Sequence, residues 1–452
     1  MGREYLRDNL RTPFALRHSA SSSLHETGDS VIIIMKRPCG PLDIISDLPN
    51  NIIENILMRL PICDAVGTSI LSKKWRYKWL TLPHLVIDNA LGKKLLGRQQ
   101  SAKNELVSAV YQVLLLHKGP IVKFVLEVDE LESYSDIDHW INFLSNHDIQ
   151  EFTLSRAKTE HYKLPSYFFT FLHLRHLKLR GCAFRPPPRF KGFSKLISLQ
   201  LEDILMDAET FGSLISSCPL LEQLTVSGYI PYDSLEISAP NLKSFSFTGD
   251  FGSICFKNTL LLAEVTVALC RVNKNVKHQS SNLIKIGRSL PAVEKLYLEG
   301  YFLEFLALGN VPKRLPILFN NLKVLHLDEM DFSNLDEILC SLCLITSSPN
   351  LEELRVVAYA GDIARDAVVE YFGTQNLSHH SLKRLQKVKM EEISNFEPEL
   401  EFIKFILASS PSLEEMEVLR SEDTVGEDER KMWKELMRFR RASPKAEVIY
   451  LQ

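Results

Sequence analysis

The sequence has 452 residues, of which 45% are hydrophobic and 24% are charged, and its formal net charge is −3. This composition is typical of a globular protein with a sizeable core, and it excludes a protein that binds polyanions over its whole surface. Its eight cysteines have no regular spacing and no apolar run reaches the ~18 residues of a membrane span, so a reducing compartment (cytoplasm and/or nucleus) is expected, without a membrane partner.

Residues 1–40 are expected to form a disordered N-terminal extension. This segment lacks the apolar centre of a secretory signal. It also contains acidic residues, which transit peptides avoid: Glu4, Asp8, Glu26 and Asp29.

Two short helices are predicted next. In DLPNNIIENILMRLP, Pro49 stands near the start of a helix, where its missing N–H does no harm, and Pro61 ends that helix. A second helix follows in DAVGTSI, where Asp64 can act as the cap. The first helix has an amphipathic face made of Ile52, Ile53, Ile56, Leu57 and Leu60.

A third helix is predicted over SILSKKWRYKWL, because Leu71, Trp75 and Trp79 fall four residues apart and would share one stripe. The four basic residues in this stretch do not gather on one side, which argues against a helix that follows a phosphate backbone. A nuclear address and a solvated charged face are both compatible with the basic cluster. Three short helices bury too little surface to be stable alone, so this part of the chain is expected to bind a partner.

A repeat of the form apolar-x-x-apolar-x-apolar runs through the rest of the chain. The last four positions of each copy alternate apolar and polar residues, which is the period of a β-strand. Copies begin at residues 121, 149, 174, 196, 221, 242, 262, 293, 322, 351, 385 and 413.

Prolines support the repeat, because five of them stand two residues before a copy. Proline cannot continue a helix, so each is predicted to end a helix and release the chain into a strand. Residues 207–218, 334–348 and 398–410 show helical spacing of apolar residues directly upstream of such prolines. The five prolines are Pro219, Pro240, Pro291, Pro349 and Pro411.

Strand plus helix at this period is the pattern of the leucine-rich repeat, in which stacked units share one core and expose a curved strand face. The alternative is a mixed α/β domain with coincidental matches, which is disfavoured because the copies are numerous and the proline offset recurs. The predicted fold class is therefore α/β, a three-helix module followed by an irregular solenoid. At the end of the chain, an apolar helical face and the strand AEVIYL are expected to cap the last repeat, with the face made of Met432, Trp433, Leu436 and Met437.

No catalytic, cofactor-binding or metal-binding residues are predicted. Cys340 and Cys343 have metal-type spacing, but no second pair lies at a suitable distance and the surrounding sequence is apolar, so they are expected on a buried helix face. The chain contains no glycine-rich phosphate loop and no G-x-S-x-G nucleophile turn, so no enzyme active site is expected.

Residues 43–88 resemble an F-box of the kind found in plant F-box/FBD/LRR-repeat proteins. The matching features are Leu48-Pro49, the run from Ile56 to Pro61, and TSILSKKWR. Residues 136–154, 186–203 and 214–226 also resemble that family, and the tail from residue 381 is similar to its FBD region, so the resemblance covers most of residues 41–452. One departure is Gly67, where the family usually carries a basic residue, and a helical glycine costs about 1 kcal/mol relative to alanine.

The resemblance implies a non-catalytic subunit of an SCF-type ubiquitin ligase, whose F-box binds a Skp-type adaptor and through it a cullin. The repeats would then hold an unknown target protein. The alternatives are a repeat-based scaffold without a ligase and, less favoured because of the negative net charge, a nucleic-acid-binding module. The predicted adaptor-binding residues are Leu48, Pro49, Ile56, Leu57, Leu60, Leu71 and Trp75, each of which could instead pack within the module or against the first repeat. The expected organisation is residues 1–40 extension, 41–88 F-box, 89–118 helical linker, 119–380 leucine-rich repeats, and 381–452 FBD region and C-terminal cap.

Overall fold

The protein was analysed as a computed structural model. The chain forms two compact units, residues 1–123 and residues 124–452. The predicted extension at residues 1–40 lies outside the described part, as do residues 90–101 of the predicted linker. The structure describes residues 45, 47–89, 102–128, 134–156, 160–228, 232–272, 281–312, 314–359, 365–374, 382–422 and 424–451.

The first unit begins with two short helices whose starts are set by proline. Helix α2 follows Pro49 and ends before Pro61, as predicted, and helix α3 begins directly after Pro61, two residues ahead of the predicted cap Asp64. Its elements are α2 (Asn50–Leu57), α3 (Ile62–Gly67), the 3-10 helices η2 (Thr68–Ile70) and η3 (Lys78–Thr81), strand β1 (His84–Ile87) and helix α5 (Ala102–Leu116).

The prediction of a regular third helix is wrong. Residues 71–77 form turns between η2 and η3, so Leu71 does not share a stripe with the tryptophans: Leu71 is 53% exposed, whereas Trp75 is 2% exposed. The reason is a pair of contacts that lead back to the start of α2. The indole of Trp75 and the ammonium of Lys74 donate to the backbone carbonyls of residues 45 and 48, and the chain makes both contacts in a turn conformation.

The second unit is built on one sheet of parallel strands, whose register shifts at two places, between Leu327 and Met330 and between Met390 and Ile393. Neighbouring strands from β3 to β18 pair in parallel, with chain order and sheet order the same. From β2 onward the strands of this sheet are β2 (Lys123–Glu127), β3 (Glu151–Ser155), β5 (His176–Arg180), β7 (Ser198–Glu202), β8 (Gln223–Ser227), β10 (Ser244–Gly249), β12 (Glu264–Leu269), β13 (Lys295–Gly300), β14 (Val324–Asp331), β15 (Glu353–Tyr359), β16 (Lys387–Ile393), β17 (Glu415–Arg420) and β18 (Glu447–Leu451).

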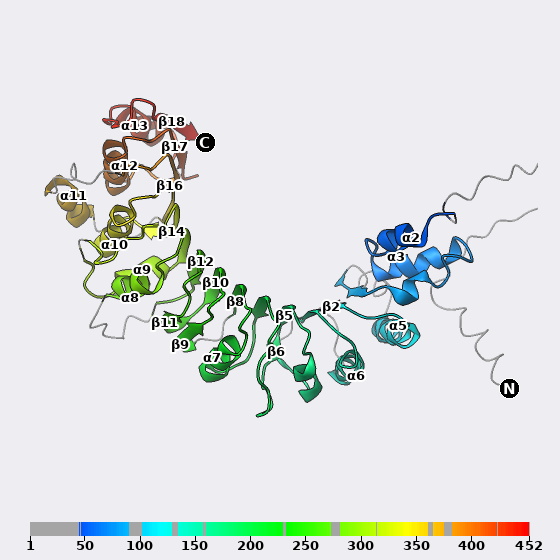
Figure 1. Cartoon of the computed structure of the whole chain (residues 1–452). Helices are drawn as coiled ribbons and strands as arrows, with labels where there is room; N and C mark the ends of the chain where they lie inside the picture. Colours follow the sequence, from blue (N-terminus) through cyan, green and yellow to red (C-terminus); the bar gives the residue numbers. More distant parts are fainter. Residues whose placement is uncertain are drawn as a thin grey trace, which may run out of the picture. The chain divides into compact units, whose positions relative to one another are not determined.

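Every predicted copy of the repeat corresponds to one of these strands, so the solenoid prediction is confirmed. The apolar positions face inward: in β10, for example, Phe245 and Phe247 are each 1% exposed while Ser244 and Ser246, which alternate with them, are half-buried. Within the second unit the row of strands curves, and helices lie along its outer side (Figure 1). The helices are α6 (Tyr134–Leu144), η4 (Ser166–Thr170), α7 (Ala208–Ser216), α8 (Asn282–Ser289), α9 (Phe302–Ala307), α10 (Leu335–Thr346), α11 (Arg365–Thr374), α12 (Glu397–Ser409) and α13 (Glu427–Leu436).

The prolines end helices at four of the five predicted places. Upstream of Pro240 the structure has a strand instead, β9 (Tyr232–Ser238), so the prediction of a helix is wrong there. This segment alternates apolar and polar residues, and it pairs in parallel with β11 (Phe251–Lys257). A second short pair is formed by β4 (Tyr162–Lys163) and β6 (Cys182–Ala183).

The C-terminal segment continues the same sheet. Strands β16, β17 and β18 extend it, and α13 provides the predicted helical face, in which Met432 and Leu436 are fully buried. Met437 is 59% exposed and lies just beyond the helix, so it does not belong to that face. The predicted strand AEVIYL corresponds to β18, at the end of the sheet.

Candidate partner-binding surfaces

In the first unit, the residues predicted to bind an adaptor divide into a surface set and a core set. Leu57 and Trp75 are 1% and 2% exposed, so they stabilise the unit from within and are not on its surface. The other five are accessible: Pro49, Ile56 and Leu71 are exposed, and Leu48 and Leu60 are half-buried.

Helix α2 explains this division. Ile53 and Leu57 lie one turn apart and face the core, while Ile52 and Ile56, also one turn apart, are 40% and 38% exposed. The single amphipathic face expected from the sequence is therefore two neighbouring faces, of which one is covered. We call the exposed large apolar residues between residues 45 and 77, with Pro49, the apolar surface; they are Ile45, Pro49, Ile52, Ile56, Met58, Ile70, Leu71 and Tyr77.

Several members of the apolar surface were missed as candidates. Ile70 is 89% exposed and Tyr77 is 62% exposed, although both belong to the segment that the sequence predicted to be helical. The spacing of Ile52 and Ile56 was a usable signal, because four apolar residues in six positions of α2 exceed what one buried stripe needs. A group of exposed large apolar side chains marks an interaction site more often than isolated ones do.

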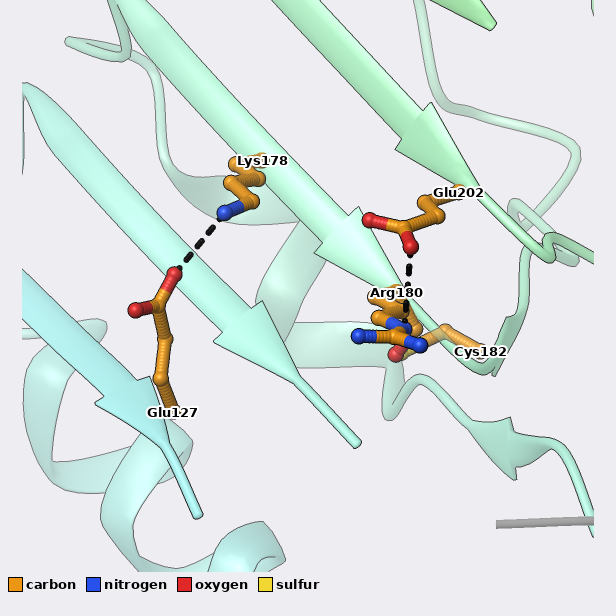
Figure 2. A network of polar contacts seen from close by, with 5 residues as sticks. All are labelled: Glu127, Lys178, Arg180, Cys182 and Glu202. Atoms are coloured by element: carbon orange, nitrogen blue, oxygen red, sulfur yellow. Dashed lines mark hydrogen bonds and ion pairs between the residues drawn. The ribbon is translucent and has the colours of Figure 1, made fainter. Parts of the chain in front are cut away.

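The inner strand face of the second unit is polar and partly charged. In its N-terminal part, Lys178 contacts Glu127 at 2.9 Å and Arg180 contacts Glu202 at 3.1 Å, each pair joining different strands (Figure 2). In its C-terminal part, Glu391 forms ion pairs with Arg355 at 2.5 Å and with Lys389 at 2.8 Å.

Between these charged parts the exposed and half-buried positions of β8 and β10 carry only hydroxyl and amide side chains. They are Gln223, Thr225, Ser227, Ser244, Ser246 and Thr248.

Two side chains on the inner face, His326 and Glu391, have pKa values shifted from their ordinary values. Partial burial, and then the positive charge of Arg355, lower the pKa of His326, whose ring packs edge-on against Tyr297 at 4.6 Å between centroids. Burial alone would raise the pKa of Glu391, but its hydrogen bonds to Lys389 and Arg355 hold that pKa below its ordinary value. The two shifts favour an uncharged His326 and an ionised Glu391 near neutral pH, and the ionised carboxylate keeps its ion pairs to Arg355 and Lys389.

Nothing in the described part of the chain forms a metal centre. Cys340 and Cys343 lie buried in α10, as predicted, and burial raises the pKa of the Cys343 thiol to about 11. Over the described residues there is no group of three or more side chains of the types that hold a metal ion. In the same residues, every helix is too short or too polar to cross a lipid bilayer.

Comparison with known proteins identifies both units. An F-box domain model matches residues 45–86, and a model of the LRR repeats of "FBD-associated F-box protein At5g56370" matches residues 137–356. The F-box/FBD/LRR-repeat protein At1g13570 of Arabidopsis thaliana is 41% identical over 91% of this chain and 99% of its own length. The F-box/LRR-repeat protein At4g14096 of the same plant is 26% identical over 83% of this chain and 88% of its own length.

Proposed function

This chain belongs to the F-box/FBD/LRR-repeat family of plant proteins, and from this premise we propose that it is the substrate-recognition subunit of an SCF-type ubiquitin ligase. In this proposal, the F-box binds a Skp-type adaptor that is joined to a cullin, and the leucine-rich repeats hold a target protein for ubiquitination. We assign the F-box to residues 41–88, the linker to 89–118, the repeats to 119–380 and the FBD region with its cap to 381–452.

The observation that carries the proposal is the apolar surface, which lies within the residues that match the F-box. Fully burying an aliphatic side chain of this size is worth about 1.5–3 kcal/mol, and interfaces are held by a few such anchors. We propose Leu48, Pro49, Ile56, Leu60 and Leu71 as adaptor contacts. Leu57 and Trp75 contribute from the core by fixing the shape of α2 and the turns.

The inner strand face supports the second half of the proposal. A curved row of strands offers alternating side chains from many repeats to one large partner. The ion pairs across strands fix long charged side chains before a partner arrives, which lowers the entropic cost of ordering them on binding.

The proposed mechanism involves no bond chemistry by this chain. By holding both the adaptor and a target, the protein keeps a target lysine close to the ubiquitin-charged enzyme. Tethering of this kind raises the effective concentration of two groups to roughly the millimolar range.

The proposal is tested by co-expressing the full chain with a plant Skp-type adaptor and cullin and measuring their co-purification. We expect a stable complex that Ile56→Ala/Leu71→Ala weakens by about tenfold or more. Leu115→Ala/Leu116→Ala is the matched control, because both leucines are exposed on α5 outside the F-box match, and it should leave the complex intact.

Two results would contradict the proposal: full-strength adaptor binding by the Ile56→Ala/Leu71→Ala variant, or no adaptor binding by the unmodified chain. The second result would favour the alternative, a repeat-based scaffold that acts without a ligase. Adaptor binding without recruitment of the cullin would also favour the scaffold.

A further inference from the structure

One segment of the repeats has a charge balance unlike the rest of the chain. From residue 161 to residue 201 there is no aspartate or glutamate, although the chain as a whole has more acidic than basic residues. The same segment carries Lys163, Arg175, Lys178, Arg180, Arg185, Arg189, Lys191 and Lys195.

The structure sorts these cations into neutralised and open ones. Lys178 and Arg180 on the inner face are paired with Glu127 and Glu202, two residues that lie outside the segment (Figure 2). Five others are exposed and form no ion pair with the described residues; these are Lys163, Arg175, Arg185, Arg189 and Lys191. The unneutralised positive charge of the segment therefore belongs to exposed residues such as these five and not to Lys178 and Arg180 on the inner face.

Two of the open cations line a hollow. An open cavity of about 660 Å³ is bordered by His161, Lys163 and Arg185, with Asp138 and Glu160 also in its lining. The pairing of β4 with β6 brings these basic residues together, because Lys163 lies opposite Ala183, two residues before Arg185. Asp138, in the lining of the cavity, accepts a hydrogen bond from the hydroxyl of the buried Tyr162. We call this cavity the basic hollow.

We propose that the basic hollow binds an acidic segment of the target protein, with Lys163 and Arg185 as the contacts to its carboxylates. This inference rests on the proposed function, because it specifies which part of the repeats meets the target and with what chemistry. Charge complementarity with the surrounding segment carries it. Lys163 and Arg185 line a cavity large enough for side chains, have no ion-pair partner in the described residues, and belong to a stretch, 161–201, that has no carboxylate to balance its cations.

Nucleic acid is the less suitable partner for the same charges. Arg175 and Lys195 precede β5 and β7, at the edge where the parallel strands begin, whereas Lys163 is the last residue of β4 and Arg185 lies two residues after β6. A phosphate backbone needs a continuous track of cations, and these stand at opposite edges.

The test uses the full chain in complex with its adaptor and three fluorescent probes. The probes are a glutamate-rich peptide, the same peptide with every glutamate replaced by glutamine, and a single-stranded oligonucleotide of equal net charge. We expect only the glutamate peptide to bind well, with an affinity that falls as salt concentration rises. Lys163→Gln/Arg185→Gln should weaken its binding by about three- to tenfold, the size expected for two exposed charge contacts.

Lys383→Gln/Arg384→Gln provides the matched control. It removes the same two charges from an exposed turn ahead of β16, and it should change peptide affinity by less than about twofold. Equal loss in both variants would overturn the proposal, as would equal binding of the glutamine peptide. Tighter binding of the oligonucleotide than of the glutamate peptide would overturn it in favour of nucleic acid. Adaptor co-purification is measured in parallel, so a failure here is distinguishable from a failure of the proposed function.

Discussion

The indole nitrogen of Trp75 donates a hydrogen bond to the backbone carbonyl of Ile45, 30 residues earlier in the chain, at 3.1 Å. The tryptophan ring is almost fully buried, and the contact fixes the segment that leads into α2. Trp75 therefore supports the apolar surface from behind, since the position of α2 determines where Ile52 and Ile56 are presented.

Replacing Trp75 with phenylalanine should loosen this support while keeping most of the buried ring. The variant loses one hydrogen bond, a net loss of about 1 kcal/mol, with a further small cost for the unfilled volume. We expect amide hydrogen exchange in α2 to become roughly five- to tenfold faster, because 1.4 kcal/mol is a factor of ten. Tyr77→Phe is the control: Tyr77 is 62% exposed, and its variant should exchange like the unmodified chain. Unchanged exchange in Trp75→Phe would contradict this role.

The residues just before α2 are predicted to contact the adaptor directly. Leu48→Ala/Pro49→Ala removes one half-buried and one exposed apolar side chain but keeps the backbone carbonyls that accept Lys74 Nζ and the first amides of α2. We expect adaptor affinity to fall by about tenfold, as for loss of a moderate interface anchor. The measurement is a titration of the purified chain with adaptor, and hydrogen exchange of α2 shows whether the unit is still folded. An unchanged affinity would remove these two residues from the interface.

Gly67 should be a stabilising site for substitution. Its backbone is helical, with φ −58° and ψ −30°, and a Cβ atom added there would meet nothing within 4 Å. Gly67→Ala is therefore expected to stabilise the first unit by about 0.5–1 kcal/mol, because it reduces the freedom of the unfolded chain without strain. Thermal unfolding and exchange of α3 measure the gain. Gly181→Ala provides a contrast: with φ +66° and an added Cβ only 2.3 Å from the Arg156 carbonyl oxygen, it should destabilise the second unit.

The strands could be predicted because each depends on local sequence alone. In LKSFSF, for example, Phe245 and Phe247 alternate with serines, and this alternation decides which side is buried whatever the neighbours are. The same local rule applies to β9, whose apolar and polar residues alternate. The helix predicted before Pro240 was wrong because it relied on the proline alone. There, the residue pattern and the proline signal disagreed, and the pattern determined the structure.

The candidate surfaces could be predicted only in part, because they depend on contacts between distant residues. Trp75 was predicted to contact the adaptor, with packing inside the module as the alternative, and its partner carbonyl at residue 45 cannot be identified from local periodicity. The basic hollow depends on Lys163 and Arg185, which are brought together by the pairing of two short strands. The lack of acidic residues from 161 to 201 was a signal available in the sequence, although it does not show which cations are paired.

Two buried glutamates tie the start of outer helices to the strands before them. In α12, Glu399 accepts hydrogen bonds from the Ser394 and Phe396 amides on one oxygen and from the Ser394 hydroxyl on the other. In α10, Glu337 accepts the Asp331 amide and the Asn334 side-chain amide on separate oxygens. Burial raises the pKa of each carboxyl to about 7, against the effect of these hydrogen bonds.

This raised pKa predicts a pH dependence of stability with a definite sign. Because the unfolded carboxyl has a pKa of about 4.3, the folded state binds more protons than the unfolded state between roughly pH 4.5 and 7. The free energy of unfolding should therefore fall as pH rises through this window, by up to about 3 kcal/mol per group.

Glu399→Gln should remove its share of this fall at little cost, since the amide oxygen can accept both backbone amides and the amide nitrogen can donate to the Ser394 hydroxyl. Glu337→Gln should flatten the fall equally but cost about 1–3 kcal/mol at every pH, because its amide nitrogen would face a donor. Urea unfolding of the second unit, followed across this pH range, measures both effects. A slope that is the same in Glu399→Gln as in the unmodified chain would show that Glu399 is ionised in the folded protein throughout.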